Sequence, residues 1–384
     1  MGQADLTGQP ASFCEGYSWY GPARLNQMKR IPSIENKHLM NCAGSRGLAV
    51  SVLLFMFLIC PLVCPGQRAT VIDPNAASSK SVEDLSNAAL KASQLRADPP
   101  QLLETADKKE FTREFVAVQW RPGDRIYLYV VRPVNVRKPP VAIYIYGHPS
   151  DTDRFQDDGW CQRTTSGGYA AVGLVPALTG QRYHDRPMKE WFVSELQESL
   201  AKSAHDVQMV LNYLAERGDF DMSNAGVFGV GAGGTIAVMA ASVDSRIKAI
   251  DLLDPWGDWP VWMQKSAVIP EEERPAYAKP EFLKKVADFD PVKLLPALKT
   301  ARIRLSQLND DSDSTPEEAK KRIEEALPAT AEHRRFETSA AFYSEIASGG
   351  RVFDWLKLQI KAPDTKVREA TKETPPGAGS GSGK

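Results

Sequence analysis

Short apolar runs alternate with amphipathic stretches through the central part of the chain. Continuous apolar runs of about four to eight residues are typical of strands in a parallel sheet that is covered on both faces. Such runs, with one weaker member at the end, predict strands at residues 141–146, 170–175, 226–230, 247–253, 303–308 and 335–337. Ahead of them, the segments 114–120 and 125–131 flank the turn Pro122-Gly123-Asp124 and predict an antiparallel hairpin.

Amphipathic helices are predicted between the strands. The clearest covers residues 189–217 and ends at Gly218. Its apolar residues recur at steps of three, four and seven and therefore form one face: Phe192, Leu196, Leu200, Val207, Leu211 and Leu214. Weaker patterns predict helices at 233–241, 315–327 and 351–360, and Ser81 can cap a helix in the segment 81–97. This alternation predicts a doubly wound α/β domain with a mostly parallel sheet.

An apolar stretch near the beginning of the chain predicts export. Residues 47–66 carry no charge, and they follow a basic flank that contains Lys29, Arg30, Lys37 and Arg46. This order is typical of a secretory signal peptide, and Pro61 and Pro65 favour cleavage near Gly66. The alternative is a retained membrane anchor, because about 20 apolar residues can span a bilayer. The flank is long for a signal peptide, so Met28 or Met40 is an alternative start.

The rest of the chain divides by composition. Residues 67–110 are polar with one predicted helix, residues 111–362 form the α/β domain, and residues 363–384 predict a disordered tail because they contain almost no large apolar side chain. An insertion at 255–300 carries Trp256, Trp259 and Trp262 after a predicted strand, which predicts a lid over a pocket. The alternative is that these rings only fix the insertion in place.

Charge and cysteine content narrow the expected partners. A formal net charge of −1 over 384 residues gives no reason to expect nucleic acid. Four of the five cysteines lie in or before the apolar stretch, so a cleaved chain keeps only Cys161, without a disulfide partner. No metal-binding spacing occurs, and no cofactor is expected. We expect a small-molecule or peptide-like ligand, and a membrane contact only through an uncleaved leader.

The most informative segment for chemistry is GVFGVGAGG at residues 226–234. It ends a predicted strand in closely spaced glycines and leads at once into the apolar helix TIAVMAAS. This pattern resembles the nucleophile elbow of the α/β-hydrolase superfamily, which reads G-x-S-x-G between a strand and a helix. The order of elements over residues 114–361 agrees, with the hairpin first, YGHPS at the oxyanion-loop position, then the elbow, then NDDSD at 309–313. The resemblance implies the α/β-hydrolase fold with its antiparallel N-terminal hairpin.

A phosphate-binding loop is the competing interpretation of these glycines. Gly229, Gly231 and Gly234 fit the spacing G-x-G-x-x-G. The loop is not in the first strand–helix–strand unit, however, and Asp251 or Asp254 would have to serve as the acidic partner. We therefore favour the elbow.

The same resemblance shows what this chain lacks. Gly231 stands at the position of the catalytic serine, so the reacting hydroxyl is missing. Asp311 matches the position of the catalytic acid, although it could equally belong to a polar turn that caps the next helix. The alternatives to it are Asp254, Asp310 and Asp313. The family's histidine should follow the last strand, near residues 340–344, but the nearest one, His333, precedes that strand.

The backbone part of the family's site does not depend on the serine. The resemblance assigns the oxyanion hole to the amides of Ala232 and His148, and Trp256 would cover the ligand. We therefore expect an exported, non-catalytic α/β-hydrolase-like protein that binds a small or peptide-like ligand. One alternative is an active esterase or peptidase with relocated groups, such as Cys161, Ser166 or His148. The other is a purely structural protein with a filled pocket.

The leader generates the first prediction. Expressed in a Gram-negative host, the protein should be released by periplasmic extraction and begin near Gln67, because the apolar stretch ends at Gly66. N-terminal sequencing checks this. An intact chain beginning at Met28 or Met40 in the membrane fraction would show an anchor instead.

Overall fold

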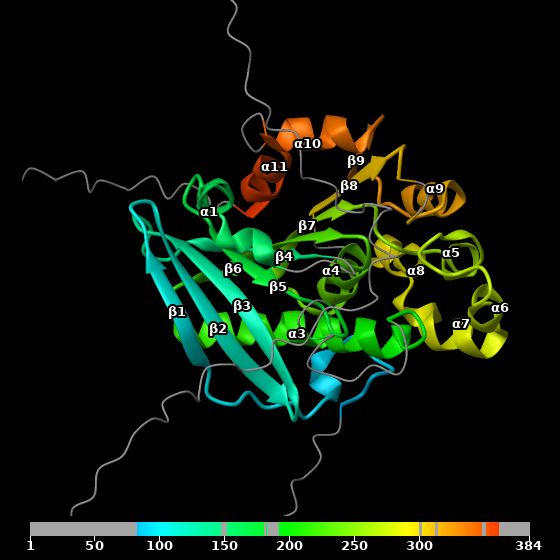
Figure 1. Ribbon diagram of the computed structural model, residues 1–384, viewed down its shortest axis with the longest axis horizontal. Helices are drawn as coiled ribbons and strands as arrows, with labels where there is room; N and C mark the ends of the chain where they lie inside the picture. Colours follow the sequence, from blue (N-terminus) through cyan, green and yellow to red (C-terminus); the bar gives the residue numbers. More distant parts are fainter. Residues whose placement is uncertain are drawn as a thin grey trace, which may run out of the picture. The chain divides into compact units, whose positions relative to one another are not determined.

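The structure, a computed structural model, describes residues 83–146, 152–179, 182, 192–298, 302–311, 314–347 and 351–360 (Figure 1). The predicted leader, the predicted tail at 363–384 and His148 lie outside the described residues. Within the described ranges, no helix is long and apolar enough to cross a membrane. The same ranges contain no group of histidine, cysteine and acidic side chains that could hold a metal ion.

A nine-stranded sheet forms the centre of the domain. In spatial order its strands are β1 (Gln101–Asp107), β2 (Phe111–Arg121), β3 (Asp124–Pro133), β5 (Ala170–Leu174), β4 (Pro140–Ile145), β6 (Asp221–Val230), β7 (Ile247–Leu253), β8 (Arg302–Leu308) and β9 (Glu332–Phe336). All pairs from β5 to β9 are parallel, whereas β1, β2 and β3 are antiparallel to their neighbours. The predicted hairpin is β2–β3, and the predicted parallel sheet is confirmed. β1 is an additional edge strand. It was not predicted, because its sequence has no alternating apolar pattern.

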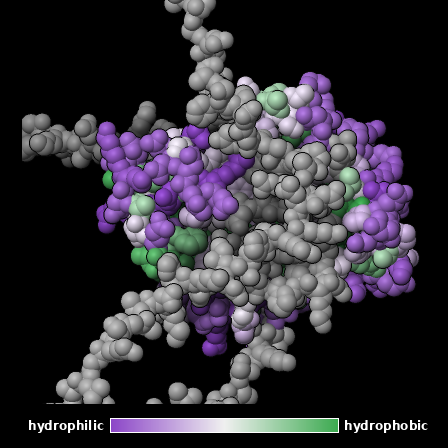
Figure 2. Space-filling view, in the orientation of Figure 1, coloured by the Kyte–Doolittle hydropathy of each residue, from purple (hydrophilic) through white to green (hydrophobic). Residues whose placement is uncertain are grey.

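Helices cover both faces of the parallel strands (Figure 1). α3 (Leu196–Arg217) and α4 (Ala232–Val243) pack on one face, and α1 (Asp158–Thr165) and α11 (Arg351–Ile360) pack on the other. α9 (Glu317–Glu325) precedes β9, and α10 (Ser339–Ala347), which the sequence did not predict, follows it. α3 ends at Gly218 as predicted, because this residue has a φ of 72°. The coloured atoms of Figure 2 show a mainly hydrophilic surface over the described residues.

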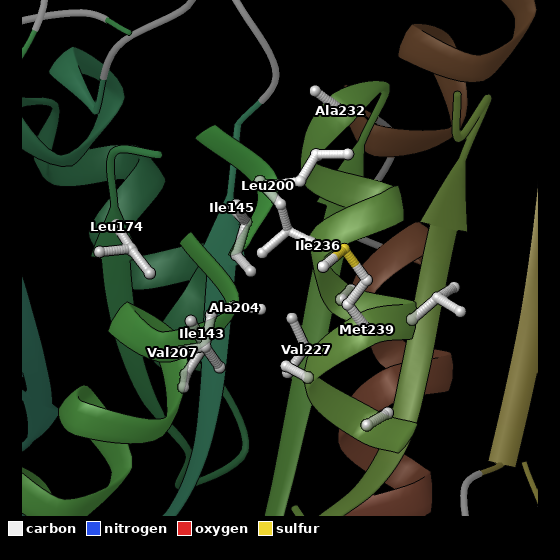
Figure 3. Packing of buried hydrophobic residues seen from close by; sticks show 14 of the residues in the cluster. Ile143, Ile145, Leu174, Leu200, Ala204, Val207, Val227, Ala232, Ile236 and Met239 are labelled. Carbon is white, nitrogen blue, oxygen red and sulfur yellow. The ribbon is translucent and has the colours of Figure 1, made fainter. Parts of the chain in front are cut away.

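Successive side chains of the central strands point alternately to the two covered faces of the sheet. Ile143 and Val227 point toward α3 and α4, among the other aliphatic residues of the core (Figure 3). On the opposite face, the Tyr144 ring lies 5.9 Å from the rings of both Phe155 and Phe228. All five side chains are buried. Burial on both faces explains why the predicted strands are continuous apolar runs.

The prediction of a helix at 81–97 is wrong. The described part of this segment consists of turns, a single 3-10 turn, η1 (Leu90–Ala92), and extended chain. The Glu83 carboxylate accepts hydrogen bonds from Arg121 on β2 and bonds to the His205 ring on α3. Because these tertiary partners take the polar groups of the segment, its local capping signal does not decide its conformation.

The insertion at 255–300 folds into short helices that pack against the domain. They are α5 (Trp259–Lys265), α6 (Arg274–Tyr277), α7 (Pro280–Val286) and α8 (Pro291–Leu294), with the short 3-10 turns η3 (Ala287–Phe289) and η4 (Leu295–Ala297); a further turn of this kind, η2 (Asp153–Gln156), precedes α1. Trp256, Trp259 and Trp262 are at most 1% exposed and belong to the main core. This packing fixes the insertion in place, and a lid function for it stays a prediction.

Candidate functional site

Neighbouring parallel strands bring the predicted site residues to one edge of the sheet. β6 ends just before Gly231, β7 ends just before Asp254, and Asp311 follows β8 after a short turn. Carboxyl ends of parallel strands meet at one edge, where α/β proteins bind their ligands. The Trp256 amide donates to the Gly231 carbonyl oxygen at 3.3 Å, which ties the segment after β7 to the turn after β6. Gly231, Asp254 and Trp256 therefore lie close together.

The turn between β6 and α4 has the geometry that the elbow hypothesis requires. Gly231 has a φ of 54° and a ψ of −120°, a conformation that glycine adopts without strain. A Cβ atom on Gly229 would lie 2.3 Å from the Gly233 carbonyl oxygen, and one on Gly233 would lie 2.3 Å from the Ile145 carbonyl oxygen. The close approach of strand and helix at this turn therefore requires glycine at both positions.

The first turn of α4 presents backbone N–H groups at this edge. The Gly231 carbonyl oxygen accepts the amides of Gly234 and Thr235 at 3.0 and 3.3 Å. Within the part of the chain that the structure describes, the amides of Ala232 and Gly233 have no acceptor. Free N–H groups and the positive end of the helix dipole together favour an anionic or carbonyl oxygen.

Asp254 is the buried carboxylate at this edge, whereas the Asp311 side chain forms a hydrogen bond within its own loop. Asp254 is 3% exposed, and its Oδ2 accepts the Leu308 amide at 3.1 Å. Burial raises the pKa of Asp254 to about 7, although the Lys320 ammonium, whose Nζ lies 3.4 Å from Oδ1, acts in the opposite direction. Asp311 accepts the amide of Ser314 at 3.4 Å. The sequence offered Asp254 as an alternative acid, and the structure places it directly beside the elbow.

Lys320 joins the two acidic residues, and no sequence motif singles it out. Its Nζ donates to the Asp311 carbonyl oxygen at 2.9 Å and to the Leu308 carbonyl oxygen, and the residue is 1% exposed. One signal was present in the sequence: Lys320 shares the apolar face of α9 with Ile323, one turn further along. A lysine on the buried face of a helix requires acceptors in the interior.

Neither described histidine can act as a base for the elbow. His205 is fully buried in α3, and its Nδ1 lies 2.7 Å from the Glu83 carboxylate. His333 lies near the amino end of β9, at the opposite edge of the sheet from Gly231. The remaining histidines are outside the described residues. The position after β9 begins α10 with Ser339, whose amide donates to the Asp310 carboxylate at 2.7 Å.

The alternative nucleophiles Cys161 and Ser166 lie on α1 and at its end. Cys161 is buried, its thiol donates to the Phe155 carbonyl oxygen at 3.2 Å, and burial raises its pKa to about 11. A buried, protonated thiol is a poor nucleophile, so Cys161 has a structural role. Ser166 follows α1 and precedes β5, and it therefore lies at the amino edge of the parallel strands, away from the elbow.

The competing phosphate-loop interpretation loses its acidic partner. Asp251 forms a buried two-point ion pair with Arg304, with oxygen–nitrogen distances of 2.9 and 2.6 Å. Asp254 is buried against Lys320. Neither carboxylate is available to a ribose hydroxyl.

Comparisons with known proteins agree with this geometry. No family model and no curated protein matches the sequence. An acetyl xylan esterase from Paenibacillus sp. R4 matches the structure with a TM-score of 0.54 and 18% identity, over 71% of this chain and 91% of that chain. An acetyl xylan esterase from Thermoanaerobacterium sp. matches with a TM-score of 0.51 and 14% identity, over 66% of this chain and 87% of that chain. The S-formylglutathione hydrolase of Agrobacterium tumefaciens matches with a TM-score of 0.50 and 15% identity, over 68% of this chain and 100% of that chain.

This chain has the α/β-hydrolase fold. At these identities the likeness concerns the fold, and the chemistry has to come from the residues. The α/β-hydrolase fold places a nucleophile at the turn after β6, where this chain has Gly231.

The backbone of Gly231 generates a stability prediction. Gly231→Ser and Gly231→Ala should each lower the free energy of unfolding by about 1–3 kcal/mol, because both place a Cβ on a residue with positive φ. Urea unfolding measures this. Gly257→Ala is a control for glycine replacement without positive φ, since its Cβ would meet only side chains at 3.1–3.2 Å. An unchanged stability in both Gly231 variants would remove the elbow assignment.

The buried carboxyl of Asp254 generates a pH prediction. Its pKa is about 7 in the folded protein against 3.8 for the free side chain, so between these pH values the folded protein keeps a proton that the unfolded chain has lost. The free energy of unfolding should therefore fall as the pH rises from 4 to 7, by at most about 1.4 kcal/mol per pH unit from this group. Asp254→Asn should remove this contribution, whereas the exposed Asp288→Asn should keep it. Identical pH profiles for wild type and Asp254→Asn would contradict the assignment.

Proposed function

We propose that this protein is a member of the α/β-hydrolase superfamily whose elbow is non-catalytic and binds a small or peptide-like ligand at the start of α4. The observation that carries the proposal is Gly231: the elbow backbone is intact, but the residue at the nucleophile position has no side chain. Glycine removes the reacting group and also the backbone strain that a serine endures there. The fold is thus relaxed at the position where an enzyme of this kind is strained.

The ligand group that the site favours is a carboxylate or carbonyl oxygen. The amides of Ala232 and Gly233 supply the hydrogen-bond donors, and the dipole of α4 adds a positive potential. The solved structures of similar fold include esterases, which act on acyl groups. A small acid, ester or peptide end fits the same kind of backbone donors. The backbone of Trp256 lies beside the elbow, and its buried ring packs against Phe192 and Trp262.

The alternative of an esterase or peptidase acting at the elbow has less support. The carboxylate of Asp254 is engaged by Lys320 and the Leu308 amide, and the thiol of Cys161 is buried and protonated. A triad needs a nucleophile, a base and an acid in mutual hydrogen-bond contact. The described residues at this edge offer only the acid.

We also propose that the protein acts outside the cytoplasm. The basis is the sequence of residues 47–66 with its basic flank, as set out above. A ligand-binding protein in that compartment needs no disulfide here, since the only cysteine after the leader, Cys161, is buried and reduced.

Ligand binding can be measured by thermal shift and calorimetry with small carboxylates, esters and short peptides. A ligand at about 100 times its dissociation constant should stabilise the protein by about 2.7 kcal/mol. Gly231→Ser should weaken its binding by about tenfold, because the new side chain enters the space beside the α4 amides. Gly218→Ser is the matched control, since it also places a serine at positive φ but at the far end of α3.

Two results would contradict the proposal. One is binding that is equally strong in wild type and Gly231→Ser. The other is stoichiometric fluorophosphonate labelling of a hydroxyl group at the carboxyl edge of the sheet, for example Ser314, because this reagent reports an activated nucleophile.

A further inference from the structure

A serine and a lysine meet at the amino edge of the sheet, far from the elbow. Ser166 follows α1, and Lys357 lies on α11, 191 residues further along the chain. The Lys357 Nζ lies 2.7 Å from the Ser166 Oγ. Both groups also bond to the Arg163 carbonyl oxygen, the lysine at 2.6 Å and the serine at 2.8 Å. Neither contact belongs to the hydrolase site described above.

Lys357 is buried, whereas its serine partner is exposed. Lys357 is 4% exposed, and this burial lowers the pKa of its ammonium to about 8. Asp354 lies one turn before it on α11 and opposes this shift. Arg163 on α1 contacts it through its carbonyl oxygen, and the Lys357 Nζ lies 6.0 Å from the centre of the Tyr169 ring. A lysine with such a pKa is neutral in a substantial fraction of molecules at slightly alkaline pH.

A surface hollow gives access to the serine. It has a volume of about 460 Å³ and is lined by Ser166, Thr165, Gln162, Asn135, Val136 and Gly168, together with Glu110 and Pro133. Ser166 is itself exposed, so its hydroxyl can meet a molecule in the hollow. The amide side chains of Gln162 and Asn135 are hydrogen-bond donors on the same wall. The volume suits a small organic molecule.

A lysine that only caps the carbonyl groups at the end of α1 would not need a hydroxyl group within reach or a buried ammonium. An exposed hydroxyl in hydrogen-bond contact with a buried amine is the arrangement that activates serine in serine–lysine enzymes. We propose that Ser166 and Lys357 form a second reactive site, in which Ser166 accepts an acyl group from a small ester that enters the hollow. This site is independent of the proposed function at Gly231.

The chemistry balances with water as the only further reactant. The neutral Lys357 amine takes the proton of the Ser166 hydroxyl while Oγ forms a bond to the acyl carbon of the ester. The bond from that carbon to the leaving oxygen then breaks, and the Lys357 ammonium returns its proton to this oxygen. The products are an acylated Ser166 and an alcohol. Water, deprotonated by the same amine, then forms a bond to the acyl carbon. The bond from that carbon to Oγ breaks, the Lys357 ammonium returns its proton to Oγ, and the acid is released.

The test uses p-nitrophenyl acetate with the full chain and follows acetylation by mass spectrometry of peptides. One acetyl group should appear on Ser166, and its rate of formation should rise with pH through about 8, the pKa of Lys357. Lys357→Arg keeps a cation that can cap α1 but cannot act as a base, so it should slow the acetylation by about a hundredfold with an unchanged melting temperature. Ser166→Ala should abolish the labelled peptide, and the exposed Ser223→Ala should retain it.

Three outcomes would overturn the proposal. They are an unlabelled Ser166 in the folded protein at pH 9, equal labelling in wild type and Lys357→Arg, and acetylation of the lysine instead of the serine. The two proposed sites share no residue and lie at opposite edges of the sheet. Failure of this proposal therefore leaves ligand binding at the elbow untouched, and the reverse also holds.

Discussion

The close contact between α4 and strand β4 is the constraint on which the rest of the site depends. No atom larger than hydrogen fits on Gly233, because a Cβ there would lie 2.3 Å from the Ile145 carbonyl oxygen. This contact fixes the helix against the sheet, so that Ile236 and Met239 enter the core (Figure 3). It also fixes the direction in which the first amides of α4 point. Gly229 and Gly233 are required by close contacts with other backbone atoms, whereas Gly231 is favoured by its positive φ.

Most of the fold could be predicted from local sequence patterns. Strands buried on both faces appear as apolar runs, and the long helix α3 appears in its repeating apolar face, so both are visible without knowledge of their partners. The elbow could also be predicted from a local pattern. Its glycines are required by contacts between residues that are close in sequence, such as that between Gly229 and Gly233. The short β9 was predicted to begin at Arg335, whereas it begins at Glu332. Its polar, half-exposed sequence gives little periodic signal.

What the sequence could not predict depends on distant partners. Glu83 looks like part of a helix start, but its carboxylate is bound by Arg121 and His205. The sequence does not explain why Asp206 lies in the buried part of a helix. The structure does, because Arg121 and Arg182 form ion pairs with it in the interior. The sequence also could not show which of Asp254 and Asp311 is the buried acid beside the elbow. Lys320, on a helix further along the chain, pairs with the Asp254 carboxylate and contacts only the backbone of Asp311. Such contacts join residues that no local pattern connects.

The position of Lys320 bears on what a catalytic triad at this edge would require. Its ammonium is an internal counter-ion for the Asp254 carboxylate, whereas in an active triad the partner of the acid is a histidine. Hydrolysis by a triad at the elbow would therefore need a hydroxyl at Gly231, a base after β9 and the removal of Lys320 from between its acceptors. These changes fall on three separate elements, and removal of the lysine alone would leave the buried Asp254 carboxylate without its counter-ion. No single substitution would therefore assemble a catalytic triad at this edge of the sheet.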